Sequence, residues 1–564
     1  MSSFDYVFLS LYVLGVFLIG IISSRRIKSQ SDMFSAGGNA PWWASGLSGF
    51  MTMFSASTFV VWGGIAYRYG LVAVAINICN GIAALLVGYY VAGKWNKLGI
   101  STPASYVELR FGKIGLNFYT WTMMLKKVLG TAVSVYSLAI VLVALIPLDE
   151  GHFLRDVATG NLSLNWAIII FGIIVVAYTM IGGLWAVLMT DVLQFIVLTL
   201  VVIMVTTLMI NGVDNFKDTL LSLPEGFFSP TAAEYGWIFL AGWVIINFFG
   251  IGAEWAFVQR YTAVKSPVEA RKSAYLFGSL YFIAPLIWLF PTIMYRNINP
   301  NANPEQAYIL ASQSVLPVGV LGLMFAAMFS ATASMVSSQL NVFAGVLTND
   351  FYKPLINPNA SENILVKVGR IFTAALGIIL ILTALFVPLM GGAEKLIISI
   401  NSLLVVPLLA PALWGLFSKR IGVLEMCLVA LVSFSVGLLL RFGFQIIGGN
   451  INVLVGVILP VIMLAIMDFL KRNKIDKGWE LIEANRNKVS NLNTAKEKEN
   501  KIIDTFPQKV VMISLAVCAL SLFVLMFLTD NGKIIIGVFG TCLLLIALGI
   551  QFKIKSLTKK NRLL

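Results

Sequence analysis

The sequence predicts an all-α integral membrane protein whose chain crosses the bilayer many times. Of its 564 residues, 59% are hydrophobic and only 12% are charged, whereas about a quarter of a typical soluble domain is charged. Apolar segments recur along the chain, and each reaches the length of about 20 residues that a membrane-spanning helix needs. Helices satisfy their own backbone hydrogen bonds in lipid, so these segments predict a helical bundle.

We expect about fifteen transmembrane helices. The first follows an acidic residue and precedes a basic cluster, which is the reverse of a secretory signal, so we expect it to be retained. Short loops that carry basic residues flank many of the others. The expected spans are residues 6–24, 42–66, 71–91, 114–146, 164–180, 185–210, 237–257, 274–294, 315–347, 371–389, 396–417, 423–440, 451–469, 510–528 and 534–550.

The distribution of charge orients these spans. Loops assigned to the cytoplasmic side are rich in Lys and Arg, whereas an outside loop carries the acidic pair Asp149 and Glu150. This alternation places the N-terminus outside and the C-terminus inside the cytoplasmic membrane. The net charge of +14 therefore reflects anchoring in the lipid bilayer. No basic stripe on a soluble domain is visible, so we expect no binding to nucleic acid.

Polar residues inside the apolar segments are candidate sites, because each is costly in lipid. Ser334, Ser337 and Ser338 are spaced i, i+3 and i+4, so their hydroxyls share one helical face. Clustered oxygens suit a hard cation such as Na⁺; small packing residues that bond to their own helix are the alternative. Asp191 favours the ion site, because a buried carboxylate needs a counter-charge, a proton or a cation. An interfacial acid is the alternative there.

Other polar residues are typical of a solute site. The second span is crowded with Gly, Ser and Thr, as in discontinuous helices that expose carbonyls to ions and solutes, although a helix-packing face has the same composition. Asn77 and Asn80 lie one turn apart in the third span, and Asn247 lies in the seventh. Neutral amides suit hydroxyl-rich or zwitterionic solutes, or join helices to one another.

Adjacent lysines, Lys126 and Lys127, interrupt the fourth span. Neighbouring residues point in different directions on a helix, so we expect at most one of them to face a cavity, where it could bind an anion. The other could extend to the inner interface.

No pattern in the chain indicates an enzyme. Its single histidine, His152, lies in a loop, which nearly excludes a His-based metal or catalytic site. No spacing typical of metal ligands or of a nucleophile and its base is present. The cysteines lie within apolar segments, as small core residues do, and they are Cys79, Cys427, Cys518 and Cys542.

Five motifs follow one another from the second span to the ninth. They are Ser55-Ala56-x-Thr58-Phe59, TPASYVELRFGK, Tyr178-Thr179-x-x-Gly182-Gly183-Leu184-x-Ala186, VQRYTAVKS and TNDFYKP. In these motifs the chain resembles the sodium:solute symporter family, which includes sodium/sugar, sodium/proline and sodium/sialic acid transporters. The resemblance covers roughly the first 470 residues. It implies a sodium-coupled symporter that imports a small polar solute (a sugar, an amino acid or a carboxylate such as sialic acid) by alternating access, with Na⁺ as the coupling ion.

The resemblance also implies a core of two inverted five-helix repeats. We place this core at residues 42–420, with the repeats at about 42–212 and 237–420. The other expected parts are a first helix with a cytoplasmic loop, two peripheral helices, a mostly basic cytoplasmic linker, and a further helical hairpin with a basic tail. These occupy residues 1–41, 421–470, 471–509 and 510–564.

For sodium, the resemblance implies two sites. The main site corresponds to three backbone carbonyls and one hydroxyl, those of Met51, Phe54, Ala331 and Ser334. Its second hydroxyl falls on Met335, whose thioether is a poor ligand for a hard cation. An additional site of some members corresponds to a carboxylate and three hydroxyls, those of Asp191, Ser334, Ser337 and Ser338. We expect ion binding first at this additional site.

For the solute, the resemblance implies a cavity lined by polar side chains of several spans, namely Ser55, Thr58, Asn77, Asn80, Asn247, Tyr281 and Lys127. A sugar transporter of the family has a lysine where Tyr281 falls, and an aromatic gate near residues 249–250, so we do not expect simple recognition of a galactose-like sugar. Ser55 and Thr58 are similar to the sialic acid pattern. Lys127 falls close to an arginine of those members, which suggests a carboxylate.

Two alternatives stay open at this point. Met335 and the titratable Asp191 are compatible with a proton-coupled or uncoupled solute transporter of the same fold. A membrane sensor that reuses the fold is less favoured, because the linker at residues 471–509 is too short for a kinase domain and contains no histidine.

Overall fold

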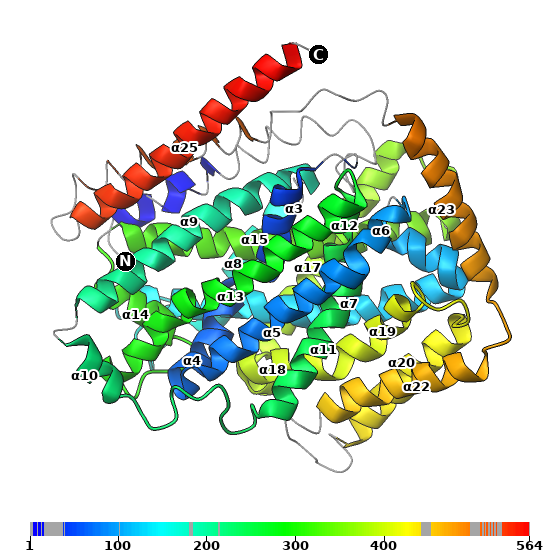
Figure 1. Ribbon diagram of the computed structural model, residues 1–564. Helices are drawn as coiled ribbons and strands as arrows, with labels where there is room; N and C mark the ends of the chain where they lie inside the picture. Colours follow the sequence, from blue (N-terminus) through cyan, green and yellow to red (C-terminus); the bar gives the residue numbers. More distant parts are fainter. Residues whose placement is uncertain are drawn as a thin grey trace.

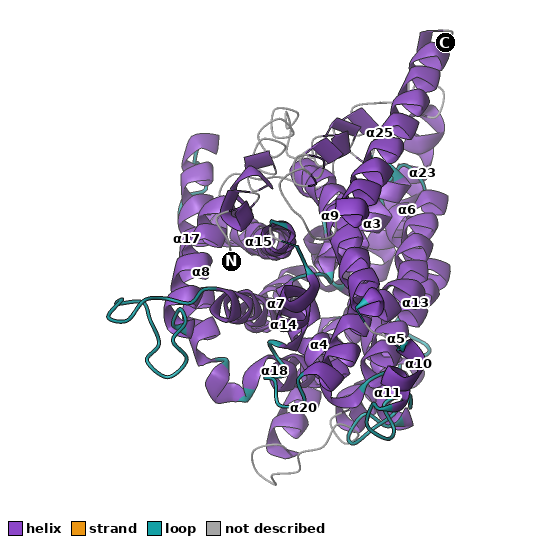
Figure 2. Ribbon diagram, turned by 90° about the vertical axis from the view of Figure 1, so that its left-hand side faces the viewer, coloured by secondary structure: helices purple, strands orange, loops and turns teal. Residues whose placement is uncertain are grey.

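The structure, a computed structural model, is a bundle of helices (Figure 1). It describes residues 40–100, 102–179, 184–212, 215–317, 319–440, 453–496 and 533–562, together with scattered residues before 40 and between 508 and 526. Within these residues only isolated bridges and no named strands occur, and helices make up most of the molecule (Figure 2). The expected all-α class is therefore confirmed.

Eight helices of the described chain are long and apolar enough to cross a membrane, and the bent pair α11 and α12 would make a ninth. Shorter apolar helices, where three further spans are expected, occupy Leu164–Ala177, Val423–Leu438 and Val455–Leu470. The expected spans at residues 6–24 and 510–528 fall largely outside the described residues. The full count of about fifteen therefore stays a prediction.

The elements fall into three groups along the chain. Those before residue 212 are α3 (Trp42–Thr52), η2 (Thr58–Trp62), α4 (Gly63–Tyr69), α5 (Val72–Val87), η3 (Gly88–Ala92), α6 (Gly93–Lys97), α7 (Pro103–Leu145), α8 (Leu164–Thr179) and α9 (Leu184–Asn211). Those up to residue 414 are α10 (Phe216–Leu221), α11 (Trp237–Ala253), α12 (Trp255–Thr262), α13 (Pro267–Ile298), α14 (Ala307–Val315), α15 (Val320–Val346), η4 (Leu347–Tyr352), α16 (Lys353–Leu355), α17 (Glu362–Phe386), η5 (Pro388–Met390), α18 (Gly392–Ile400), η6 (Asn401–Val405) and α19 (Val406–Trp414). The remaining ones are α20 (Val423–Leu438), η8 (Leu454–Ile458), α22 (Leu459–Leu470), α23 (Lys477–Lys496) and α25 (Lys533–Arg562).

Helices from both halves of the chain pack against one another at the centre of the bundle. α5 lies against α11 and α13, and α15 lies against α7, α8 and α9. α25 lies along the outside of the bundle next to α9 (Figure 1). Segments far apart in sequence therefore meet at the centre of the bundle.

The second expected span is broken near its centre. α3 ends at Thr52, and after a short non-helical stretch the chain continues through the π-helical turn η2 into α4. Hydroxyl groups bind the backbone N–H groups at the break. Thr58 Oγ1 accepts from Ser55 N at 3.3 Å, and Thr332 Oγ1 of α15 accepts from Ala56 N at 2.9 Å. The run of Gly, Ser and Thr thus marks a discontinuous helix, as expected, whose backbone is satisfied by nearby side chains.

The seventh expected span, at residues 237–257, is also broken. α11 ends at Ala253, α12 begins at Trp255, and their axes differ by 55°. Glu254 lies between them with extended backbone (φ −68°, ψ 134°). The carboxylate of Glu254 is buried and held by two lysines of α7.

The helix α7 begins at Pro103, ahead of the fourth expected span. A kink at Gly112, whose φ is +71°, separates its first part from the expected span at residues 114–146. Glycine adopts this left-handed region without the steric cost that a Cβ atom brings. The motif TPASYVELRFGK therefore forms a helical segment at the end of the span, which places Arg110 against neighbouring helices.

Part of the expected cytoplasmic linker forms the helix α23, which packs along α7 and α6 (Figure 1). The guanidinium of Arg110 is buried and donates to the carbonyl oxygens of Gly415 at 3.1 Å and Ser418 at 3.0 Å. Its Nη1 pairs with Asp476 Oδ1 at 2.5 Å, just before α23 begins. Trp479 of α23 is buried in the same contact. One arginine thus joins α7, the end of α19 and the linker.

This contact predicts a stability change. Asp476→Ala should lower the free energy of unfolding by about 1.5–3 kcal/mol, because a buried guanidinium loses its charged acceptor. The midpoint of thermal unfolding in detergent measures the effect. Glu483→Ala, at an exposed position of α23, is the matched control and should unfold like the parent protein. Equal midpoints for both variants would show that this ion pair does not hold the linker.

Candidate functional site

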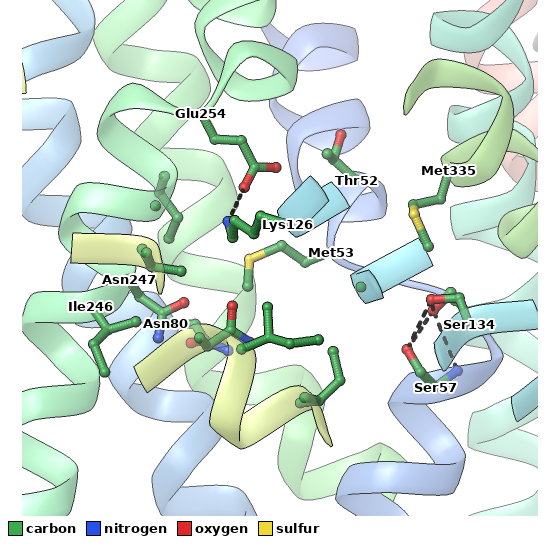
Figure 3. A pocket seen from close by; sticks show the side chains of 18 of the residues that line it. Thr52, Met53, Ser57, Asn80, Lys126, Ser134, Ile246, Asn247, Glu254 and Met335 are labelled. Carbon is green, nitrogen blue, oxygen red and sulfur yellow. Dashed lines mark hydrogen bonds and ion pairs between the residues drawn. The ribbon is translucent and has the colours of Figure 1, made fainter. Parts of the chain in front are cut away.

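A cavity lies between the two broken helices (Figure 3). Residues of the α3–η2 break line one side of it, Glu254 lies at the bend after α11, and α5, α7 and η6 complete the wall. Hydroxyls, amides and charges dominate its polar lining, which comprises Thr52, Ser55, Ser57, Asn80, Lys126, Lys127, Thr131, Ser134, Asn247, Glu254 and Asn401. Such a lining at the centre of a membrane protein suits a polar solute.

Four of the seven residues expected at the solute site line this cavity, namely Ser55, Asn80, Asn247 and Lys127. The other three are buried but lie outside its lining. Thr58 accepts from the backbone of Ser55 at the helix break. Asn77 donates to the carbonyl of Ala73 in its own helix at 2.8 Å. Tyr281 packs in an aromatic cluster, 5.0 Å from the ring of Phe50. Their direct contact with a solute stays a prediction.

Asn80 presents an open hydrogen-bonding position in the cavity. Among the described residues, its buried Oδ1 atom has no hydrogen-bond partner. Asn247 lies nearby on α11 and donates from Nδ2 to the carbonyl of Trp243 at 2.8 Å (Figure 3). A buried acceptor without a partner is costly, so Asn80 is poised to accept from a donor on a bound solute.

Ser57 and Ser134 lie on the wall opposite Asn80 (Figure 3), and with Ser55 they form a hydroxyl cluster. Ser55 Oγ lies 2.6 Å from Ser57 Oγ and 3.3 Å from Ser134 Oγ of α7. Ser57 and Ser134 lie 3.5 Å apart. Ser57 and Ser134 were not among the expected site residues. The serines of the break and of the middle of α7 thus provide adjacent donors and acceptors.

Both adjacent lysines face the cavity, so the expectation that at most one would do so is wrong. Lys126 Nζ lies 3.0 Å from Glu254 Oε2 (Figure 3), and Lys127 Nζ pairs with Oε1 of the same carboxylate. The reason is the position of Glu254 at the bend, where two long flexible side chains can reach it from either side. Sequence reasoning missed Glu254, although an acid inside an apolar span is the signal that singled out Asp191.

A second charged cluster is built around Asp191 of α9. Ser334 Oγ donates to Asp191 Oδ1 at 2.8 Å, and Ser48 Oγ donates to Oδ2 at 2.6 Å. Arg260 of α12 lies 3.8 Å from Oδ2 through its Nη2 atom. The structure therefore brings together Asp191 and Ser334, as expected. It adds Ser48 and Arg260, which the sequence reasoning missed although Arg260 lies within the quoted motif VQRYTAVKS.

The other serines of the expected ion site lie one turn further along α15. Ser337 is buried and its hydroxyl accepts from Asn341 Nδ2 at 3.4 Å, and Ser338 is half-buried. Among the described residues, neither hydroxyl forms a hydrogen bond with the carboxylate of Asp191. Their contact with a shared ion stays a prediction.

Residues expected at the main sodium site lie on two elements that touch. Met51 and Phe54 flank the end of α3, where the N–H of Phe54 donates to the carbonyl of Met51 at 3.0 Å. Ala331 lies on α15, next to Thr332, whose hydroxyl accepts from the N–H of Ala56 at the helix break. Met335 lines the cavity itself. The role of Met51, Phe54, Ala331 and Ser334 as sodium ligands stays a prediction.

Acidic residues fix the N-terminus of α18, on the side expected to face outside. Glu305 accepts from Tyr136 of α7 at 2.7 Å and from the backbone N–H of Ala393 at 2.9 Å. Glu394 pairs with Arg68 of α4.

The sequence is similar to those of known sodium-coupled transporters. A sequence model of the sodium:solute symporter family matches residues 33–424. The chain is 30% identical to a sodium/glucose cotransporter of Vibrio parahaemolyticus over 74% of this chain and 82% of that protein. It is 25% identical to a sodium/sialic acid symporter of Aliivibrio fischeri over 81% of this chain and 92% of that protein.

Solved structures show the same fold. The chain is similar to a sodium-coupled sialic acid symporter in a substrate-bound outward-open state, with a TM-score of 0.70 and 24% identity. The match covers 83% of this chain and 98% of that one. A nucleobase-cation-symport-1 transporter in a closed conformation matches with a TM-score of 0.53 and 16% identity, over 81% of this chain and 99% of that one.

The shared carboxylate predicts a stability change. Glu254→Gln should lower the free energy of unfolding by about 3–5 kcal/mol, because two buried ammonium groups lose their counter-charge. The double variant Glu254→Gln/Lys126→Gln removes one of these charges, and we expect it to regain part of the loss. Thermal unfolding in detergent measures both. A double variant less stable than the single one would show that repulsion between the lysines is not the cause.

Proposed function

The chain belongs to the sodium:solute symporter family, and we propose that the solute it imports with sodium is a small hydroxylated carboxylate. The observation that carries this proposal is the charge balance of the cavity, where two lysines share the carboxylate of Glu254. With its three charged groups ionised, the lining carries one positive charge in excess. A neutral sugar would leave that charge buried, whereas a carboxylate on the solute would match it.

The distribution of polar groups supports a hydroxylated solute. The lysine pair and the serine cluster of Ser55, Ser57 and Ser134 lie on different parts of the cavity wall. Asn80 adds an acceptor that lacks a partner among the described residues. A solute with its carboxylate near Lys127 and its hydroxyls toward the serines and Asn80 would satisfy both sets of groups. Sialic acid, the solute named for two of the relatives, has this chemistry.

We propose that sodium binds at the Asp191 cluster, with Ser334 as the contact already formed and with Ser337 and Ser338 on the same helical face. The carbonyls of Met51, Phe54 and Ala331 with Ser334 form the second proposed site. Met335 makes this site the weaker of the two, because a thioether is a poor ligand for Na⁺.

The sodium gradient is large enough for concentrative uptake. One Na⁺ that moves through about 100 mV supplies about 2.3 kcal/mol. A tenfold concentration ratio adds about 1.4 kcal/mol. Together these would sustain a solute ratio on the order of several hundredfold.

The proposed transport cycle is alternating access by two inverted repeats, at residues 42–212 and 237–420. The first helix of each proposed repeat is broken, at the end of α3 and between α11 and α12. Both breaks border the cavity. In this arrangement the N-terminus would lie outside the cytoplasmic membrane and the C-terminus inside.

A thermal-shift comparison tests the solute class. We expect sialic acid and gluconate to stabilise the purified protein in NaCl more than in choline chloride, and glucose to have little effect, because bound ligands stabilise by mass action. Lys127→Gln should raise the ligand concentration needed for half-maximal stabilisation by roughly tenfold, since it removes a charged hydrogen bond. Lys113→Gln, at an exposed position of α7, should behave like the parent protein. Equal stabilisation by glucose and gluconate, unaffected by Lys127→Gln, would contradict the proposal that the solute is a carboxylate.

Sodium dependence tests the ion site. Asp191→Ala should raise the sodium concentration for half-maximal uptake by roughly tenfold or more, because the ion loses its only charged ligand in the cluster. The apparent affinity for the solute at saturating sodium should change little. Asp218→Ala, at an exposed position of α10, is the control. An unchanged sodium curve would remove Asp191 from the site, and uptake driven by acid without sodium would favour the proton-coupled alternative.

A further inference from the structure

The Asp191 cluster is electrically balanced by a residue of the chain itself. Arg260 Nη2 lies 3.8 Å from Asp191 Oδ2, and the two side chains are only 2% and 5% exposed. A buried carboxylate requires a nearby counter-charge. The guanidinium provides that charge in this structure.

A hydroxyl group links the two charges. Ser48 Oγ donates to Asp191 Oδ2 at 2.6 Å and accepts from Arg260 Nε at 3.2 Å. The main chain of Arg260 is fixed separately, because Ser45 Oγ donates to its carbonyl oxygen at 2.8 Å. The guanidinium also donates from Nη1 to the carbonyl of Ala256 at 2.7 Å. Arg260 is therefore held at Asp191 by contacts of its guanidinium and of its main chain.

A sodium ion at Asp191 would share this carboxylate with the guanidinium. The cluster would then hold two positive charges and one negative charge with little water nearby, and the two cations would repel each other. We propose that Arg260 is a tethered cation that occupies the charge position of a sodium ion at Asp191 and is displaced when sodium binds. This inference rests on the proposed sodium site at Asp191.

Arg260 would act in both the empty and the sodium-loaded states of the transport cycle. A symporter has to return after its ion has left, and a bare buried carboxylate would make that empty state costly. The guanidinium neutralises Asp191 in the empty state. In the loaded state it competes with sodium, so it sets how much sodium the site needs. Arg260 is thus a positioning and affinity-setting residue.

The sodium dependence of thermal unfolding and of solute uptake tests this role. Arg260→Gln removes the competing charge, so we expect half-maximal stabilisation and uptake at roughly tenfold lower sodium. Arg260→Lys keeps a cation at this position and should stay close to the parent curve. A sodium requirement that is unchanged or higher in Arg260→Gln, while Asp191→Ala alters the curve, would overturn the inference and leave the sodium site in place.

A double variant separates this inference from the proposed site. Asp191→Asn leaves the buried guanidinium without its carboxylate, whereas Asp191→Asn/Arg260→Gln removes both charges. In sodium-free buffer we expect the double variant to unfold at a higher temperature than Asp191→Asn. Equal midpoints would overturn the counter-ion role, even if Arg260→Gln alone fails to fold. A double variant with the parent sodium curve would instead show that Asp191 is no sodium ligand, and the proposed site would fall together with the inference.

Discussion

Charged side chains inside an apolar bundle have to be paired, and the central part of this molecule depends on that requirement. Lipid tails provide little hydrophobic drive for one helix to pack on another, so polar contacts and close packing have to select the arrangement. Asp191 with Arg260 joins α9 to α12. Glu254 with its two lysines joins the α11–α12 bend to α7. The cavity is lined by the second of these clusters, so the groups that hold the helices together also define its charge.

The sequence alone predicted the features that depend on local composition. The Gly, Ser and Thr residues around Ser55 indicated a discontinuous helix, whereas the pairing of Asp191 with Ser334 was implied by the resemblance to the family. It did not predict the bend at Glu254, because the apolar run around this residue is compatible with a straight helix. The partners Ser48 and Arg260 could not be predicted either, because pairing between helices depends on their packing and not on spacing along the chain. The expectation that at most one of Lys126 and Lys127 faces the cavity was wrong, because it did not include Glu254, whose carboxylate attracts both lysines.

A paired buried charge also holds the linker helix α23, which lies beyond the segment that matches the family. Its contact with the core depends on Arg110, whose charge would be buried without an acidic partner if Asp476 were absent. The kink at Gly112 lies two residues further along α7. The linker is therefore attached at the point where α7 changes direction. A movement of α7 in the transport cycle would displace the chain that follows residue 470.

The short helix α12 has a consequence for energy conversion. It comprises eight residues, Trp255–Thr262, which corresponds to a length of about 12 Å. Glu254, at its beginning, borders the solute cavity, and Arg260, near its end, lies at Asp191. With the proposed solute and sodium sites, a tilt of this helix that releases Lys127 to a solute would also change the distance from the guanidinium to Asp191. Thermodynamic linkage would then make the effect reciprocal: the factor by which sodium tightens solute binding would equal the factor by which the solute tightens sodium binding.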